Sequence, residues 1–394
     1  MNAVPLLDLF AVTAPGLEPV CAAELAAIGI NAPVAGDGGV SWRGDLRSLY
    51  RANIECRTTS RVVARAGSFR ARTFAELERH AARLPWTAFL APGCAVALRV
   101  TCRKSKLYHE GAVAARIAGV LAAAHGVRVE ACPADEAPGA AADAQLIIVR
   151  FMRDVCTISI DASGALLHQR GYRQAVARAP LRETLAAAML LSSGWRGDSP
   201  LLDPMCGSGT IPIEAALLAR RIPPGLANPE LKPRACAFQR WPGFDAGVLN
   251  DVVAAARDRV LPSAGVGIAG SDRDAGAIAA ASENAARAGV AADLVLTQAA
   301  VSALEPPTGT GYLVTNAPYG VRIGERRALH PQYAALGRVA RARLPGWTVV
   351  MLVAEPPHAG ATRFRFDELL ATRNGGIAVR LLRAHVSTHS GEDP

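Results

Sequence analysis

The chain has 394 residues, which is enough for two or three domains of roughly 150 residues each. Hydrophobic residues make up 51% of it and charged residues 20%, a composition that excludes a wholly disordered chain. Lys and Arg number 43 against 34 Asp and Glu, and the net charge of +9 favours a polyanionic partner.

The sequence also argues against a membrane segment, export and a metal site. No apolar run approaches the roughly 18 to 20 residues of a spanning helix, and residues 1–42 lack the Lys or Arg that opens a signal peptide. The eight cysteines are scattered without a CxxC pair, as is typical of reduced thiols packed in a core. We therefore expect a soluble, cytoplasmic monomer that binds neither membrane nor metal.

The N-terminal residues predict two small α/β modules. The first has strands at 10–13 and 40–42 and helices at 17–25 and from 46 to 52. The second has strands at 60–69, 95–101, 145–151 and 155–161 and helices at 74–84 and 111–124. Between Arg57 and Lys106, eleven cations stand against two acids, which favours phosphate contacts, although a solvated charged face explains the individual arginines of 57–83 about as well.

From Leu201 onward, strands alternate with long helices, which predicts parallel pairing and a doubly wound sheet that ends near Val386. The Pro- and Gly-rich stretch 223–243 reads as an insertion or an ordered loop. We expect the chemistry of the chain to lie in this C-terminal part.

The strongest motif is a strand, a glycine turn and a helix over residues 199–219. Gly207 and Gly209 let a ligand approach the backbone, the first N–H groups of the helix offer donors, and Asp203 can accept from a ligand ammonium. Pro212 stands where a dinucleotide site wants a third glycine, and no Gly-Lys-Ser/Thr follows. Hydride transfer is thus disfavoured and a P-loop is excluded.

Two further strand ends carry polar groups. Residues 267–274 form a short strand ending in Asp272, which can bind ribose hydroxyls or serve only as a helix N-cap. At residues 311–322, Asn316 Oδ1 and the carbonyl of Ala317 can accept from an exocyclic amine, while Pro318 keeps its neighbour extended and Tyr319 can stack on a base. The plain alternative is an ordinary loop.

Together these motifs resemble the class I S-adenosylmethionine-dependent RNA methyltransferases that carry a THUMP domain. The resemblance is greatest to enzymes that methylate N2 of guanine in large-subunit ribosomal RNA and in tRNA. It covers nearly the whole chain and rests on residues 10–18, 103–109, 167–173, 179–184, 203–210, 270–274 and 316–320.

The resemblance implies an α/β fold of three parts: a ferredoxin-like unit (1–62), a THUMP RNA-binding domain (63–163) and a Rossmann-like methyltransferase domain (164–394). It implies S-adenosylmethionine as cofactor, no metal, and rRNA or tRNA as partner. The implied cofactor-binding residues are Thr184, Asp203, Cys206, Gly207, Ser208, Gly209, Thr210, Ser271, Asp272 and Arg273. The implied catalytic residues are Asn316, Ala317, Pro318 and Tyr319, and the implied RNA contacts are Arg103, Lys104, Lys106, Arg170, Arg173 and Arg178.

The chain departs from the family at two positions. Ala317 stands where relatives usually have a proline, and residues 296–301 lack the acid that often reads the adenine amino group of the cofactor. Cys206 as an attacking thiolate is disfavoured against a small residue packed under the glycine turn. Three hypotheses remain: a guanine-N2 RNA methyltransferase acting by direct in-line transfer, an adenine-N6 nucleic-acid methyltransferase, and a non-catalytic RNA-binding or assembly factor.

Overall fold

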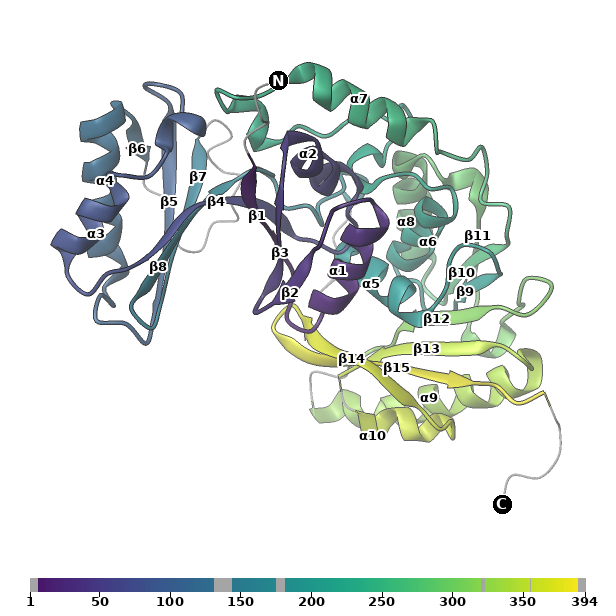
Figure 1. Cartoon of the computed structure of the whole chain (residues 1–394). Coiled ribbons are helices and arrows are strands. Elements are labelled where there is room, and N and C mark those ends of the chain that lie inside the picture. Colours follow the sequence, from purple (N-terminus) through teal and green to yellow (C-terminus); the bar gives the residue numbers. More distant parts are fainter. Residues whose placement is uncertain (1–5, 131–143, 175–180, 320–322, 355, 389–394) are drawn as a thin grey trace.

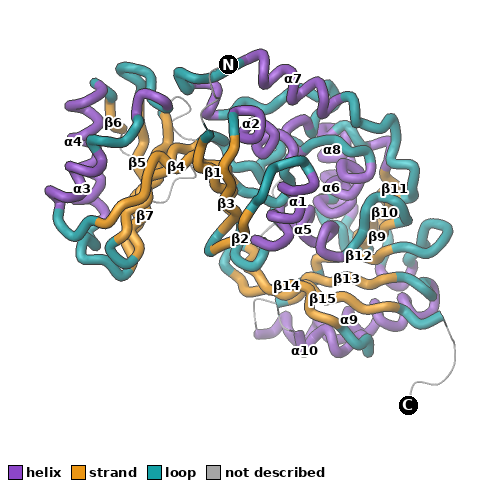
Figure 2. The backbone as a smooth tube through the Cα atoms, in the orientation of Figure 1, coloured by secondary structure: helices purple, strands orange, loops and turns teal. Residues whose placement is uncertain are grey.

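The computed structural model describes residues 6–130, 144–174, 181–319, 323–354 and 356–388. Two sheets organise this part of the chain, and Figure 1 shows them in different regions of an elongated molecule. Figure 2 shows helices packed against both faces of the C-terminal sheet, the arrangement expected of a doubly wound α/β fold. None of the described helices is long and apolar enough to cross a membrane.

The N-terminal sheet has eight strands in the order β2-β3-β1-β4-β8-β7-β5-β6. They are β1 (Leu7–Val12), β2 (Val34–Gly36), β3 (Gly39–Gly44), β4 (Arg61–Arg70), β5 (Ala95–Arg103), β6 (Arg128–Glu130), β7 (Gln145–Met152) and β8 (Val155–Asp161). The first residues of β4 pair with β1, while nearly its whole length pairs with β8. The module boundary predicted at residues 62 and 63 therefore falls inside a strand that the two modules share.

Four helices accompany this sheet: α1 (Glu18–Ala27), α2 (Leu46–Glu55), α3 (Phe74–Ala81) and α4 (Glu110–His125), with a single turn η1 (Trp86–Ala88). Local signals explain where two of them begin. Asp45 caps α2 by accepting from the backbone N–H of Ser48, and Thr73 and Glu76 form a capping box at α3. In Figure 1, α3 and α4 lie on one side of strands β5, β7 and β8.

The C-terminal sheet has seven strands in the order β11-β10-β9-β12-β13-β15-β14, of which β9 to β13 are parallel. They are β9 (Leu201–Asp203), β10 (Ile268–Asp272), β11 (Leu294–Gln298), β12 (Tyr312–Asn316), β13 (Thr348–Val353), β14 (Asp367–Asn374) and β15 (Ile377–His385). The parallel strands β9 to β13, with helices between them, confirm the doubly wound α/β fold. The last strand, β15, ends at His385, next to Val386.

The helices of this part are α5 (Glu183–Ser193), α6 (Thr210–Ala219), α7 (Ala246–Arg257), α8 (Ala275–Ala288), α9 (Ile323–Arg343) and α10 (Pro356–Ala359). Single turns lie at η2 (Pro224–Leu226), η3 (Ala237–Arg240), η4 (Ala291–Asp293), η5 (Val301–Ala303) and η6 (Gly360–Thr362). One core cluster joins α5, α6 and α8 to the sheet, and another joins α9 to its opposite face.

The residues that follow α6 pack against the N-terminal sheet. Phe238 and Trp241 and residues of α7 belong to the same core cluster as the N-terminal sheet, and the rings of Phe238 and Tyr50 stack at 4.4 Å. Figure 1 shows α7 lying beside α2. A segment within the predicted methyltransferase domain thus completes the core of the N-terminal unit.

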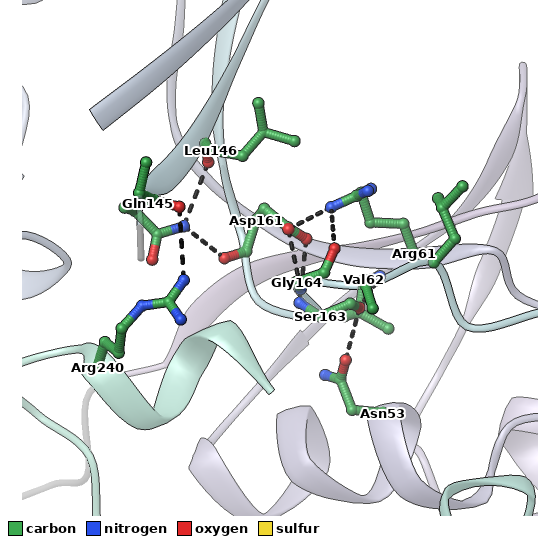
Figure 3. A network of polar contacts seen from close by, with 12 residues as sticks. Asn53, Arg61, Val62, Gln145, Leu146, Asp161, Ser163, Gly164 and Arg240 are labelled. Carbon is green, nitrogen blue, oxygen red and sulfur yellow. Dashed lines mark hydrogen bonds and ion pairs between the residues drawn. The ribbon is translucent and has the colours of Figure 1, made fainter. Parts of the chain in front are cut away.

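A buried polar network lies within the N-terminal unit (Figure 3), and the segment after α6 reaches it where Trp241 Nε1 donates to Gln145 Oε1 at 3.1 Å. Asp161 forms an ion pair with Arg61 and accepts from the backbone N–H of Ser163 at 3.0 Å. The hydroxyl of Ser163 donates to Asn53 at 2.6 Å, and Gln145 donates to the carbonyl of Asp161 at 2.7 Å. Arg61, one of the eleven clustered cations, is therefore a structural residue.

Candidate active site

Three polar side chains lie at one edge of the C-terminal sheet. Asp203 ends β9, Asp272 ends β10 and Asn316 ends β12. Because β9 pairs in parallel with both β10 and β12, the carboxyl ends of all three strands meet at the same edge. The chain also reverses direction across the sheet at β9, and ligands of open α/β sheets bind at such a switch point.

The glycine turn between β9 and α6 leaves room for a ligand. Gly207 and Gly209 have φ of +53° and +83°, a region that glycine enters at little cost. A Cβ on Gly207 would meet no heavy atom within 4 Å, so the turn has open space beside it. A Cβ on Gly209 would lie 2.9 Å from Cβ of Ala281, so this glycine allows α8 to pack closely.

The missing third glycine has a structural explanation. Pro212 packs against Gly270 of β10, where an added Cβ would lie 3.1 Å from the proline ring and 3.2 Å from Cβ of Cys206. Close packing of helix and strand is thus achieved by a glycine on the strand. Burial raises the pKa of the Cys206 thiol far above its usual range, which argues against a thiolate nucleophile.

Asp272 connects the glycine turn that follows β9 to the loop that follows β10. Its Oδ2 accepts from the N–H of Gly207 at 3.0 Å and its Oδ1 accepts from the N–H of Asp274 at 3.0 Å. The N-cap of α8 is Asp274, which accepts from Gly276. The helix-cap interpretation of Asp272 is therefore wrong, and its half-buried carboxylate retains lone pairs for ribose hydroxyls.

Asp203 is almost fully buried at the base of the site. Its Oδ1 accepts from Thr315 Oγ1 at 2.8 Å and from the N–H of Met205 at 3.1 Å. Burial, with a smaller contribution from Asp272, raises the pKa of this carboxyl to about 7. A ligand ammonium beside it would favour the ionised form.

Of the remaining cofactor candidates, Ser208 and Thr210 belong to the glycine turn and the start of α6, Ser271 to the end of β10, Arg273 to the loop after it, and Thr184 to α5. The hydroxyl of Ser271 is buried without a hydrogen-bond partner among the described residues, and the carbonyl of Ser208 accepts from Asn284. Thr184 and Thr210 are buried, whereas Arg273 is exposed. Asn284, a buried amide in α8, was missed, because a single Asn in a helix carries no sequence signal.

The loop after β12 is held by its neighbours. Ala317 is buried, and its N–H donates to the carbonyl of Leu352 at 3.2 Å. The hydroxyl of Tyr333, on α9, donates to the carbonyl of Pro318 at 3.2 Å. These bonds restrain the loop at the position where the family's first proline is absent.

The hydroxyl of Tyr319 forms hydrogen bonds to two asparagine side chains. Its hydroxyl donates to Asn316 Oδ1 and accepts from Nδ2 of Asn374 at 3.2 Å. Burial raises the pKa of this hydroxyl to about 12, so it remains a donor at neutral pH. Asn374 comes from the end of β14, 55 residues downstream, and no motif pointed to it.

Comparisons with known proteins agree with this geometry. Residues 170–378 match the family described as the RMKL-like methyltransferase domain, and residues 8–63 match the RlmL ferredoxin-like domain. The chain belongs to the RMKL-like methyltransferase family. The expected resemblance to class I methyltransferases is thereby confirmed, and S-adenosylmethionine is the cofactor of this fold.

Two relatives match nearly all of the chain. The protein slr0064 of Synechocystis, which is named as an RNA methyltransferase, is 31% identical over 95% of both chains. The ribosomal RNA large subunit methyltransferase K/L of Syntrophotalea carbinolica is 34% identical over 97% of this chain. The chain spans about half of that second relative, 54% of its length.

Two solved structures share the whole fold. SMU.472, described as a methyltransferase and solved with S-adenosylhomocysteine, has a TM-score of 0.84 at 28% identity over 98% of this chain and 99% of its own. A Listeria monocytogenes protein described as a predicted N6-adenine-specific DNA methylase has a TM-score of 0.80 at 30% identity, with 96% of each chain covered.

Two of the arginines predicted to contact RNA form ion pairs within the protein. Arg170 is buried, pairs with Glu214 at 3.4 Å and donates to the carbonyl of Arg57 at 2.6 Å, so its assignment as an RNA contact is wrong. Arg173 has a side chain 12% exposed and pairs with Glu183 at 2.7 Å. A charge pattern cannot distinguish a buried ion pair from a surface patch. Arg178 lies outside the described residues.

Arg103, Lys104 and Lys106 are exposed. Strand alternation puts Arg99 and Arg103 of β5 on the face away from α3 and α4, and Arg150 of β7 lies opposite Thr101 on that same face. We call Arg99, Arg103 and Arg150 the arginine face. None of the three has an ion-pair partner in the described part of the chain.

Proposed function

We propose that this chain transfers a methyl group from S-adenosylmethionine to N2 of a guanine in RNA. The observation that supports this best is the position of Asn316 and Ala317 at the end of β12, beside the strand that leads into the glycine turn. A side-chain amide oxygen and a backbone carbonyl next to a cofactor site are suited to hold an exocyclic amine.

When bound, S-adenosylmethionine supplies an electrophilic methyl group on a sulfonium. Asn316 Oδ1 and the carbonyl of Ala317 would each accept one N–H of the amine, which aims the nitrogen lone pair at the methyl carbon. The same oxygens would stabilise the positive charge that develops on nitrogen as the N–C bond forms and the S–C bond breaks. The electron pair of the broken bond would stay on the sulfur of the departing S-adenosylhomocysteine, and the methylated amine would lose one proton to solvent. No covalent nucleophile from the protein is needed for this transfer.

The N-terminal part would capture the RNA. Residues 63–163 would serve as a THUMP module, with the arginine face, which includes Arg103, and the exposed Lys104 and Lys106 contacting phosphates. The name of the K/L relative, a ribosomal RNA large subunit methyltransferase, supports rRNA as the substrate class.

Adenine N6 is the second candidate acceptor. Asn316 and Ala317 can grip any exocyclic amine, and the Listeria neighbour is described as an N6-adenine-specific DNA methylase. Guanine is favoured because the motifs of the chain resemble those of guanine-N2 RNA methyltransferases, and RNA is supported by two relatives named as RNA methyltransferases that match nearly all of the chain.

Paired measurements separate an enzyme from a non-catalytic RNA-binding factor. Calorimetry with S-adenosylmethionine should give a heat of binding for both the native chain and Asn316→Ala, with affinities within a few-fold. Transfer of labelled methyl groups into unmodified RNA transcripts should occur with the native chain and be lost in Asn316→Ala, because only the base acceptor is removed. An active Asn316→Ala protein, or a native chain that binds no cofactor, would refute the proposal.

A further inference from the structure

A small pocket adjoins the catalytic loop. It has a volume of ≈ 250 Å³ and lies between the residues before α5, the ring of Tyr319 and the turn that joins β14 to β15. Its polar lining consists of His168, Arg173, Arg182 and Asn374. This volume is slightly below the roughly 300 Å³ at which pockets for drug-sized ligands begin, so it suits one base.

The pocket connects directly to the acceptor of the proposed reaction. Asn374, which is 4% exposed, donates through Nδ2 to the hydroxyl of Tyr319, and that hydroxyl donates to Asn316 Oδ1. One hydroxyl thus bridges a fixed acceptor at the end of β12 and a fixed donor at the end of β14. A planar ligand displacing it would meet an acceptor on one side and a donor on the other.

The lining favours a ligand that accepts hydrogen bonds. No Asp or Glu is among the described residues that line the pocket. Arg173 is already paired with Glu183 and with the carbonyl of Leu181, whereas the exposed Arg182 has no partner among the described residues. Five N–H donors of a guanidinium are therefore available at the rim.

His168 indicates the electrostatic potential of this region. Burial and the neighbouring arginines, Arg182 foremost among them, lower the pKa of its imidazole to about 4. The ring is neutral at physiological pH, and its Nδ1 is buried without a hydrogen-bond partner in the described part of the chain. A positive potential around an unpaired ring nitrogen points to a polar ligand with acceptor atoms.

We propose that this pocket receives the O6 and N7 edge of the target guanine, with Arg182 and Asn374 as the donors that select it. The proposal deepens the proposed function and rests on it. Guanine carries an amine at C2 and two acceptors, O6 and N7, on another edge. Its amine would lie on Asn316 and Ala317 while its acceptors face the donor-lined pocket.

Adenine fits this arrangement less well than guanine, because it keeps N7 but has no acceptor in place of O6. Its single exocyclic group is the N6 amine, so an adenine held by that amine at Asn316 has no second exocyclic acceptor to place before Arg182. Reversing the base would put an amine against donors and leave the Asn316 acceptor unused. Arginine facing O6 and N7 is also the commonest specific contact to guanine in nucleic-acid complexes.

The test is a double-mutant cycle that combines one substitution in the protein with one substitution in the target base. Arg182→Gln is compared with Arg338→Gln, a control at an exposed arginine of α9 that lacks a partner among the described residues. Each protein is assayed on the transcript that the native chain methylates, made either with guanosine or with 7-deazaguanosine, which lacks the N7 acceptor. Cofactor affinity and thermal stability are measured for every variant.

We expect Arg182→Gln to lower kcat/KM on the guanosine transcript at least tenfold, mainly through KM, with cofactor affinity within twofold of the control. We expect 7-deazaguanosine to cost the native chain and Arg338→Gln about tenfold and to cost Arg182→Gln little more. If Arg182→Gln and 7-deazaguanosine each lower kcat/KM by a factor that the other does not change, the proposal is overturned and Arg182 is assigned to a phosphate contact. Equal activity of Arg182→Gln and its control would overturn it as well.

The proposed function fails in a different way. If the native chain forms no N2-methylguanosine on any transcript, the guanine-N2 reaction and this subsite both fall. If the native chain forms that product but the cycle shows no coupling, only the subsite falls.

Discussion

At the scale of single residues, the hydroxyl of Tyr319 donates to Oδ1 of Asn316, the oxygen for which the amine of the target base would compete in the proposed reaction. Tyr319→Phe should keep the stacking ring and free that oxygen, so we expect kcat within about threefold of the native value. Tyr319→Ala should raise KM for RNA substantially, because base stacking on an aromatic ring is worth about 1–3 kcal/mol. Steady-state kinetics on both variants would distinguish these roles, and a Phe variant as impaired as the Ala variant would contradict the stacking role.

The proposed contact between Asp203 and the cofactor ammonium predicts a specific pH dependence of cofactor binding. Its pKa of about 7 is raised mainly by burial, so the free site is largely protonated at pH 6, whereas a cofactor ammonium requires the carboxylate. Affinity should therefore rise roughly eightfold from about pH 6 to about pH 7.5, below the range near 8 in which α-amino groups lose their proton. Calorimetry across this window checks the slope.

Asp203→Asn is the matched control for that slope, because the amide keeps an acceptor oxygen without titrating. The variant should bind the cofactor more weakly at every pH and show a flat profile over the same window. A native profile as flat as that of the variant would show that Asp203 does not titrate on binding.

At the scale of elements, the glycine turn depends on the packing of α6 against α8. Gly209→Ala places a Cβ 2.9 Å from Ala281 at a φ of +83°, so we expect a loss of stability of about 1–3 kcal/mol and weaker cofactor binding. Gly243→Ala is the control, because a Cβ there would meet no atom within 4 Å. Denaturant unfolding of both variants measures the difference, and equal stability would contradict the packing role.

The sequence predicted the positions of helices and strands better than it predicted which distant residues contact each other. Strand alternation and helical periodicity located β4, β5, β7 and β8 and the helices between them, because each pattern lies within one segment. Asn374 at the end of β14 and Tyr333 on α9 bond to the loop after β12, and only the folded chain shows this. The three-residue β2 and β6 were too short for any period.

At the scale of the whole molecule, the two sheets are locked together by buried charges. Arg57 donates to the carbonyls of Leu217 and Ile222 at the end of α6, the helix that begins at the glycine turn. Arg170 joins Arg57 to Glu214 of the same helix. The N-terminal unit and the helix that begins at the glycine turn are therefore joined by direct buried contacts.

The arginine face should give RNA binding a measurable salt dependence. Replacing Arg99, Arg103 and Arg150 with Gln should lower RNA affinity and reduce the slope of log affinity against log salt by about 2, since each phosphate contact contributes about 0.7 on single strands. The control replaces Arg79, Arg83 and Arg116 near α3 and α4. Filter binding over a salt series should leave the control slope nearly unchanged, and equal slopes for both triple variants would place the RNA elsewhere.

The most direct measurement identifies the methylated nucleoside. The chain is incubated with labelled S-adenosylmethionine and unmodified ribosomal RNA, and the digested product is analysed by mass spectrometry. A site that holds an amine on Asn316 and an acceptor edge beside Arg182 should yield N2-methylguanosine. N6-methyladenosine as the sole product would contradict guanine as the target of this site.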